Sequence, residues 1–143
     1  MGKTKERPKV QHFTIDVPPY RKQIFVCTGF TSYKQLRKAQ SKRAEKWYLE
    51  WLDTHKENLE LQFNGKWTGS VFFNTEHGVA VFTLRGYHDC WDYWECLIHE
   101  LSHYLDFLGD QVGIAKETEA RAYLMEFLFR RIRRKLQGLD KPT

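Results

Sequence analysis

The sequence predicts a single domain of the α+β class. Its 143 residues are enough for one hydrophobic core, and 41% of them are hydrophobic and 15% aromatic, unlike a disordered chain. Short runs typical of strands alternate with longer runs at helical spacing, and no repeat or linker interrupts them. We expect the domain to cover residues 12–137, with a flexible basic arm before it (1–11) and a short tail after it (138–143).

The composition excludes several classes of protein. No apolar run approaches the roughly 20 residues that a membrane span needs. The start of the chain is basic and polar and contains no apolar signal segment. Cys27, Cys90 and Cys96 form neither a CxxC pair nor an even set, and Cys90 and Cys96 are expected to be core thiols. We therefore expect a cytoplasmic protein without a disulfide framework or a membrane anchor.

The predicted strands are short and are bounded by turn residues. They cover four apolar runs: residues 13–17, 23–28, 71–73 and 79–84. The first run stops at Pro18 and the second at Gly29. The last two are predicted to form a hairpin around a turn that contains Gly78.

Three helices are predicted from apolar residues at helical spacing: residues 32–58, 90–108 and 117–136. Ser32 and Gln35 are a possible capping box for the first. The second helix has an apolar stripe, and Gly109 is expected to end it. The stripe consists of Trp94, Leu97, Ile98, Leu101, Leu105 and Leu108. In the third helix, a comparable set of apolar residues is predicted to face the core: Ala120, Leu124, Phe127, Leu128 and Ile132.

A motif in the second predicted helix indicates a chemical function. His99-Glu100-Leu101-Ser102-His103 has the pattern H-E-x-x-H. Residues four apart share one face of a helix, so both imidazoles can point at one Zn²⁺ about 2.0–2.1 Å from each nitrogen. Glu100 lies about a quarter of a turn away, where it can act as a general base on water instead of binding the metal.

A catalytic zinc site needs a third protein ligand. No histidine follows His103, so the candidates are Glu117 and Glu119, which open the next predicted helix. A link of about eight residues lets this helix run back beside the previous one. The periodicity of its apolar residues favours Glu117. Asp106 or Glu95 is a candidate for orienting a ligand imidazole.

These motifs resemble those of gluzincin-type zinc peptidases, including the ImmA/IrrE-type and minimal gluzincin domains. Their H-E-x-x-H helix is followed by a helix with a ligating glutamate. The segment Glu119-Ala120-Arg121-Ala122-Tyr123 is also similar to the E-x-x-A-Y segment of small phage-encoded H-E-x-x-H proteins. The resemblance covers about residues 70–130. It implies a zincin-like fold and favours Glu119 as the third zinc ligand beside His99 and His103, with Glu117 as the second choice.

The resemblance also implies an activity. The expected protein is a zinc-dependent metallopeptidase of the cytoplasm, or of the host cytoplasm if it is phage-encoded, with Glu100 as the general base. Its substrate would be a protein or peptide, and the strand at residues 79–84 would border the cleft and pair with it. One alternative is a zinc-stabilised, non-catalytic module that binds protein, or nucleic acid through its basic end, Arg130–Lys135. Another is a metal-free domain that acts by contact.

Overall fold

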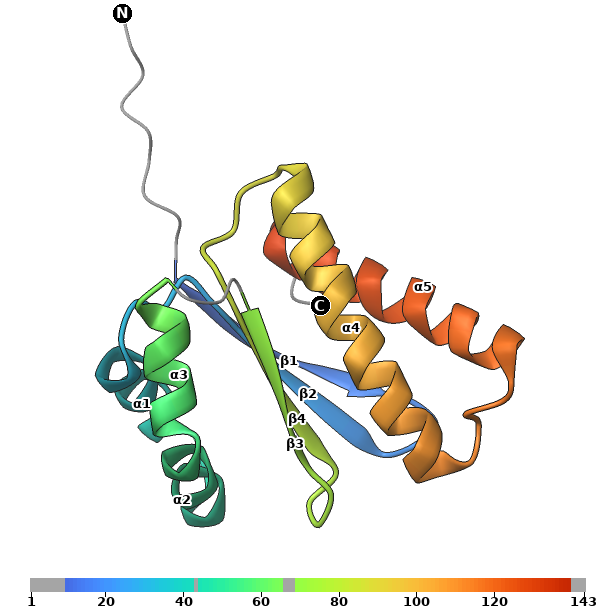
Figure 1. Ribbon diagram of the computed structural model, residues 1–143, viewed down its shortest axis with the longest axis horizontal. Coiled ribbons are helices and arrows are strands. Elements are labelled where there is room, and N and C mark those ends of the chain that lie inside the picture. The colour runs from blue at the N-terminus through green and yellow to red at the C-terminus, as the bar shows by residue number, and fades with distance from the viewer. Residues whose placement is uncertain (1–9, 43, 66–68, 140–143) are drawn as a thin grey trace, which may run out of the picture.

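A four-stranded sheet separates two groups of helices in the computed structural model, which describes residues 10–42, 44–65 and 69–139 (Figure 1). The α+β class predicted from the sequence is confirmed. The sheet consists of β1 (Gln11–Val17), β2 (Lys22–Thr28), β3 (Gly69–Asn74) and β4 (Val79–Leu84). On one face lie α1 (Tyr33–Ser41), α2 (Lys46–Thr54) and α3 (Lys56–Phe63), and on the other lie α4 (Trp91–Val112) and α5 (Thr118–Leu136).

The strands lie in the order β1-β2-β4-β3. The pairs β1–β2 and β3–β4 are antiparallel, while β2 and β4 are parallel, with Ile24 opposite Ala80. Each predicted strand is present, and β1 begins at Gln11, which the sequence had assigned to the arm. Strand β4 has a neighbour on each side, and all its residues are buried. The two edges of the sheet are β1 and β3.

Alternation along the strands builds a separate core on each face of the sheet. Ile24, Val26 and Phe82 belong to the core beneath α4 and α5. Cys27 and Val81 belong to the core beneath α1–α3, where Tyr48 and Leu52 cover them. The residues of β4 and most of those of β2 are therefore covered on both faces of the sheet, and each face has its own layer of helices.

The prediction of a single helix over residues 32–58 is wrong, because the chain forms the three shorter helices α1, α2 and α3, the last of which continues to Phe63. Ser32 caps α1 as predicted, accepting a hydrogen bond from the backbone N–H of Gln35 at 3.1 Å. The chain then becomes extended at Glu45 and changes direction again at His55. A continuous helix of this length would be about 40 Å long, whereas strands of six or seven residues span about 20–23 Å. The breaks keep the apolar residues of all three helices on the sheet.

The end of α4 also differs from the expectation. The helix continues through Gly109 to Val112, and Gly113 follows in the left-handed conformation with φ 79°. Gly109 is buried, and a Cβ there would lie 3.2 Å from the Cα of Ala115. This glycine therefore permits a close approach of the α4–α5 link, while Gly113 ends the helix.

The conformation of Gly113 leads to a prediction about stability. Gly113→Ala should lower the free energy of unfolding by about 1–2 kcal/mol, because an L-residue is unfavourable in the left-handed region. Gly113→Asn should cost less, because asparagine tolerates this conformation better. Urea denaturation of the three proteins measures the difference. Unfolding of Gly113→Ala at the wild-type urea concentration would contradict the assignment of this cap.

The predicted arm and tail lie largely outside the part of the chain that the structure describes. Most of the expected arm (1–9 of 1–11) and of the tail (140–143 of 138–143) falls outside the described residues. Within the described part of the chain, no helix has the combination of length and apolar character that crossing a membrane requires.

Candidate active site

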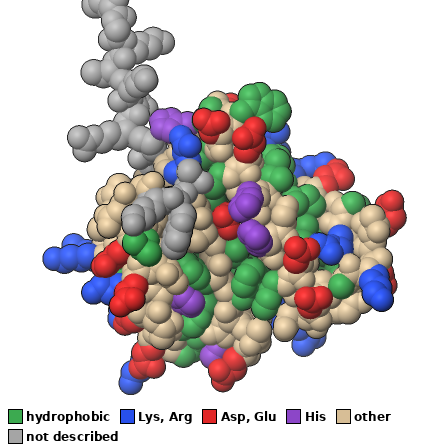
Figure 2. Space-filling view, in the orientation of Figure 1, with side chains coloured by type: hydrophobic (Ala, Val, Ile, Leu, Met, Phe, Trp, Pro, Cys, Tyr) green, Lys and Arg blue, Asp and Glu red, His purple; other side chains and the backbone are tan. Residues whose placement is uncertain are grey.

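The H-E-x-x-H motif lies in the middle of α4, and the packing of the helix fixes its rotation. Leu97, Leu101 and Leu108 are at most 1% exposed and face the sheet. On a helix with 3.6 residues per turn, these positions leave His99 and His103 on the exposed side, as the sequence predicts. Histidine side chains accordingly gather over α4 near the middle of the face seen in Figure 2.

The two imidazoles lie close together. Nε2 of His99 and Nε2 of His103 are 3.2 Å apart, and the rings are nearly perpendicular at 83°. Two nitrogens at this separation, each about 2.0–2.1 Å from a zinc ion, would subtend roughly 100° at the ion, near the tetrahedral angle. The pair therefore fits two vertices of a zinc site. When one ring is neutral, the same separation also allows an N–H···N hydrogen bond.

Glu100 lies beside this pair but is turned into the protein. Its side chain is 6% exposed, on the α4 face that packs on β3. One turn earlier, Cys96 lies against Gly69, and one turn later Tyr104 stacks on Phe73 with ring centroids 6.2 Å apart. Burial raises the pKa of the Glu100 carboxyl above its usual range, and the two histidines oppose this effect. A carboxyl with a raised pKa beside two imidazoles is suited to accept and return a proton.

The third ligand expected from α5 is not brought to this pair. In the part of the chain that the structure describes, no three or more His, Cys, Asp or Glu side chains form a group able to hold a metal. Glu117 and Glu119 are both exposed. Since α4 continues for nine residues after His103, about 13.5 Å, the chain leaves this helix well beyond the motif before it turns back into α5.

The rotation of α4 about its axis also separates the two histidines from the glutamates of α5. Trp94 contacts α5, its ring centroid lying 5.7 Å from that of Phe129. His103 follows Trp94 by nine residues, which is two and a half turns, so it faces away from α5. Asp106, expected as a candidate to orient an imidazole, instead forms an ion pair with Arg121 of α5. Binding by Glu119 or Glu117 thus stays a prediction.

The strand beside the motif is β3 and not, as expected, the strand at residues 79–84. That strand, β4, is paired on both sides and has no free edge for a peptide. In contrast, β3 pairs with one strand among the described residues and lies at the edge of the sheet. Phe73 of β3 contacts Tyr104 and Phe107 of α4. The free edge of β3 therefore runs beside the face of α4 that carries the histidines.

Two residues of the α4 region that are expected from the sequence to be buried lie at the surface near the motif. Ile98 was expected in the apolar stripe, and Cys90 in the core, but both are exposed. Together with Trp94, they line a pocket between α4 and α5. The apolar stripe predicted for α4 is wider than the face of the helix that is buried. The extra width was the sign in the sequence that part of the stripe is exposed.

Comparison of the chain with family models, with curated proteins and with solved structures gave no match.

Proposed function

We propose that the chain is a zinc-dependent peptidase whose catalytic centre is the His99–His103 turn of α4. The observation that carries this proposal is the 3.2 Å separation of the two Nε2 atoms beside the buried carboxylate of Glu100. His99 and His103 would hold the metal, and Glu119, or else Glu117, would complete the protein ligands. When bound, Zn²⁺ supplies a Lewis acid that polarises a peptide carbonyl and acidifies water.

The residues of the chain supply the remaining functions. Glu100 takes a proton from the attacking water and passes it to the leaving amine. The free edge of β3 offers main-chain N–H and C=O groups to an extended peptide, which gives affinity with little sequence preference. A peptide paired there would lie beside the exposed histidines. This edge, together with the motif, favours a peptide substrate and a zincin-like arrangement.

Metal binding and hydrolysis test the proposal together. The purified protein should bind one zinc ion per chain and hydrolyse fluorescein-labelled casein, and a chelator should stop hydrolysis reversibly. His99→Asn and His103→Asn should each lose zinc, whereas His77→Asn should retain it, because His77 stacks on Trp47 in a distant turn. A wild-type protein that binds no zinc, or a His103→Asn protein that binds it equally well, would refute the proposed metal site.

The third ligand is tested separately by zinc affinity. Glu119→Gln should weaken zinc binding, and Glu117→Gln should not. The reverse result would identify Glu117 as the ligand. If neither substitution changes the affinity, neither glutamate binds zinc.

The same measurements distinguish the non-catalytic alternative from the proposed peptidase. A protein that binds zinc through His99 and His103 but hydrolyses no peptide would be a zinc-stabilised interaction module. Nucleic-acid binding through Arg130–Lys135 would then appear as affinity that falls steeply with salt. Part of this basic end is already engaged, because Arg130 forms an ion pair with Glu126 at 2.8 Å.

A further inference from the structure

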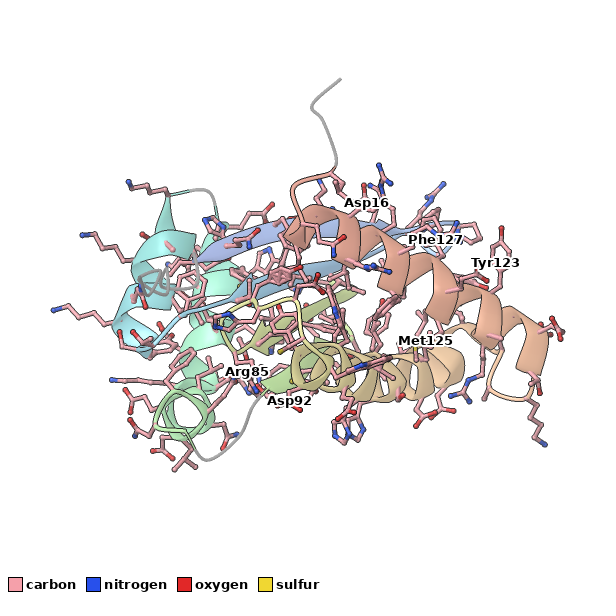
Figure 3. The ribbon with its side chains drawn as sticks, turned by 90° about the horizontal axis from the view of Figure 1, so that it is seen from above. Asp16, Arg85, Asp92, Tyr123, Met125 and Phe127 are labelled. Carbon is pink, nitrogen blue, oxygen red and sulfur yellow. The ribbon has the colours of Figure 1, made fainter. Side chains whose placement is uncertain are left out.

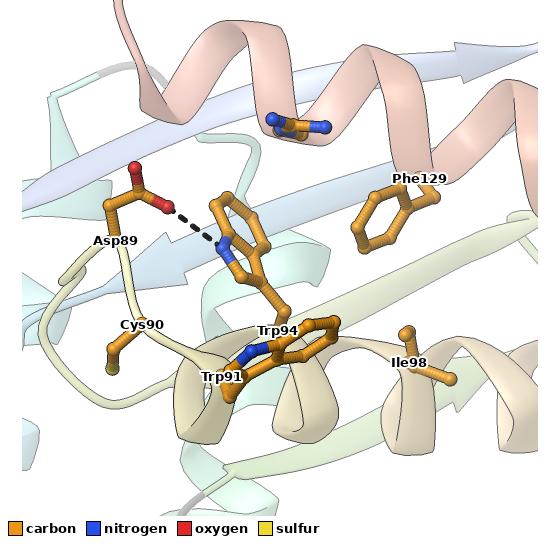
Figure 4. Close-up of a pocket in the computed structure, with 7 residues that line it drawn as sticks. Asp89, Cys90, Trp91, Trp94, Ile98 and Phe129 are labelled. Carbon is orange, nitrogen blue, oxygen red and sulfur yellow. Dashed lines mark hydrogen bonds between the residues drawn. The ribbon is translucent and has the colours of Figure 1, made fainter.

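Two large apolar side chains of α4 are exposed on the side of the helix that faces α5. Trp91 is 78% exposed and Ile98 is 42% exposed, and Ile98 follows Trp91 by seven residues, which is almost two turns. Both line a pocket of about 460 Å³ between the first half of α4 and the last half of α5 (Figure 4). An exposed apolar surface of this kind, next to a hollow, is typical of a binding site.

The walls of this pocket are held in place without a ligand. The indole Nε1–H of Trp94 donates a hydrogen bond to Oδ1 of Asp89 at 3.0 Å. The same indole packs against Phe129 on one side and against Tyr87, whose ring centroid is 5.5 Å away. Figure 4 shows Trp94 between Asp89 at one end and Phe129 with Ile98 at the other. The hollow is therefore preformed, which lowers the cost of ordering it on binding.

Arg133 brings a positive charge to the pocket. The guanidinium of Arg133 lies over the ring of Trp94, 5.6 Å from its centroid. Within the described part of the chain, no carboxylate forms an ion pair with Arg133, whereas Arg130 one turn earlier is paired. The N–H groups of Arg133 are thus available to a carboxylate, and its charge disfavours a cationic ligand. Among the described residues that line the pocket, Asp89 is the only acid, and it is already hydrogen-bonded to Trp94.

We propose that this pocket binds a peptide segment that has a large apolar side chain next to an acidic one. The apolar side chain would lie between Trp91, Ile98 and Phe129, and the acidic side chain would pair with Arg133. Ile98 directly precedes His99, so a bound segment could continue onto the exposed face of α4. The choice of a peptide as the ligand rests on the proposed peptidase function, but binding needs neither metal nor hydrolysis.

The test uses the indole N–H signals of the metal-free, ¹⁵N-labelled protein. The probe is the tetrapeptide N-acetyl-Ala-Phe-Asp-Ala-amide, and two others replace its Asp by Lys or its Phe by Gly. The Phe-Asp peptide should shift the Trp91 and Trp94 signals, and both other peptides should bind at least about fivefold more weakly. Trp91→Ala and Arg133→Gln should each weaken the binding of the Phe-Asp peptide by a similar factor.

Two matched variants control for loss of an exposed aromatic ring or of a positive charge. Tyr123 is 73% exposed on α5 and points away from the body of the protein in Figure 3, so Tyr123→Ala should bind the peptide normally. Arg130→Gln should also bind normally. The inference is wrong if no peptide shifts the Trp94 signal, or if the Lys peptide binds as well as the Asp peptide. Peptide binding without zinc-dependent hydrolysis would instead refute the proposed peptidase and leave the pocket established.

Discussion

Glu100→Gln is expected to slow zinc-dependent peptide hydrolysis by about 10²–10⁴-fold while leaving the zinc content unchanged. Glutamine keeps the shape of the side chain but cannot accept the proton of the attacking water. Zinc binding should persist because the proposed ligands are His99, His103 and a glutamate of α5, and Glu100 is not among them. The measurement is the initial rate of hydrolysis of labelled casein, with zinc determined in the same preparation.

Stability distinguishes a catalytic loss from a folding defect. Burial raises the pKa of Glu100, so at neutral pH the charged carboxylate is unfavourable in the metal-free folded protein. Glu100→Gln removes this charge and should unfold at the wild-type urea concentration or above it. Asp110→Asn, which changes an exposed acid of the same helix, should retain full activity. If Glu100→Gln keeps full activity and binds zinc, Glu100 is not the general base.

Leu97→Ala is expected to lower the free energy of unfolding by about 2–5 kcal/mol. Leu97 is fully buried between α4 and the sheet, and its truncation removes apolar contacts and leaves a cavity. The loss is a large part of the 5–15 kcal/mol that is typical of a folded domain. Chemical denaturation followed by tryptophan fluorescence measures it.

The neighbouring residue provides a matched control. Ile98 has the same number of carbon atoms as Leu97 and is 42% exposed, so Ile98→Ala should cost less than about 1.5 kcal/mol. Equal destabilisation by the two substitutions would contradict the rotation of α4 described above. That rotation also places His99 and His103 on the exposed face, so this comparison tests the position of the motif without requiring metal or substrate.

Local sequence patterns were sufficient to predict the strands and the approximate position of α4. The alternation in residues 13–17 and the apolar runs at 23–28 and 79–84 are properties of short segments, which explains why β1, β2 and β4 agree with prediction. The breaks at Glu45 and His55 were not predictable in the same way. They depend on the length of the sheet beneath α1–α3, which is set by strands distant in the sequence.

The close approach at Gly109 is a second example. A glycine after an apolar stripe usually ends a helix, and only the packing of Ala115 against it shows why this one lies inside α4. The extra turn up to Val112 then moves the end of α4 away from His103. The distance between the motif and Glu119 therefore depends on a tertiary contact, which cannot be predicted from the spacing of apolar residues along a helix.

The sequence alone determined that His99 and His103 lie one turn apart on an exposed helix face with Glu100 beside them, because helical geometry relates residues four apart regardless of their surroundings. Only the tertiary structure decided which elements surround that face. It placed the free edge of β3 next to the histidines, paired β4 on both sides, and docked α5 against the opposite side of α4 through Trp94. These arrangements follow from burying two separate sets of apolar side chains at once, which is a property of the whole chain.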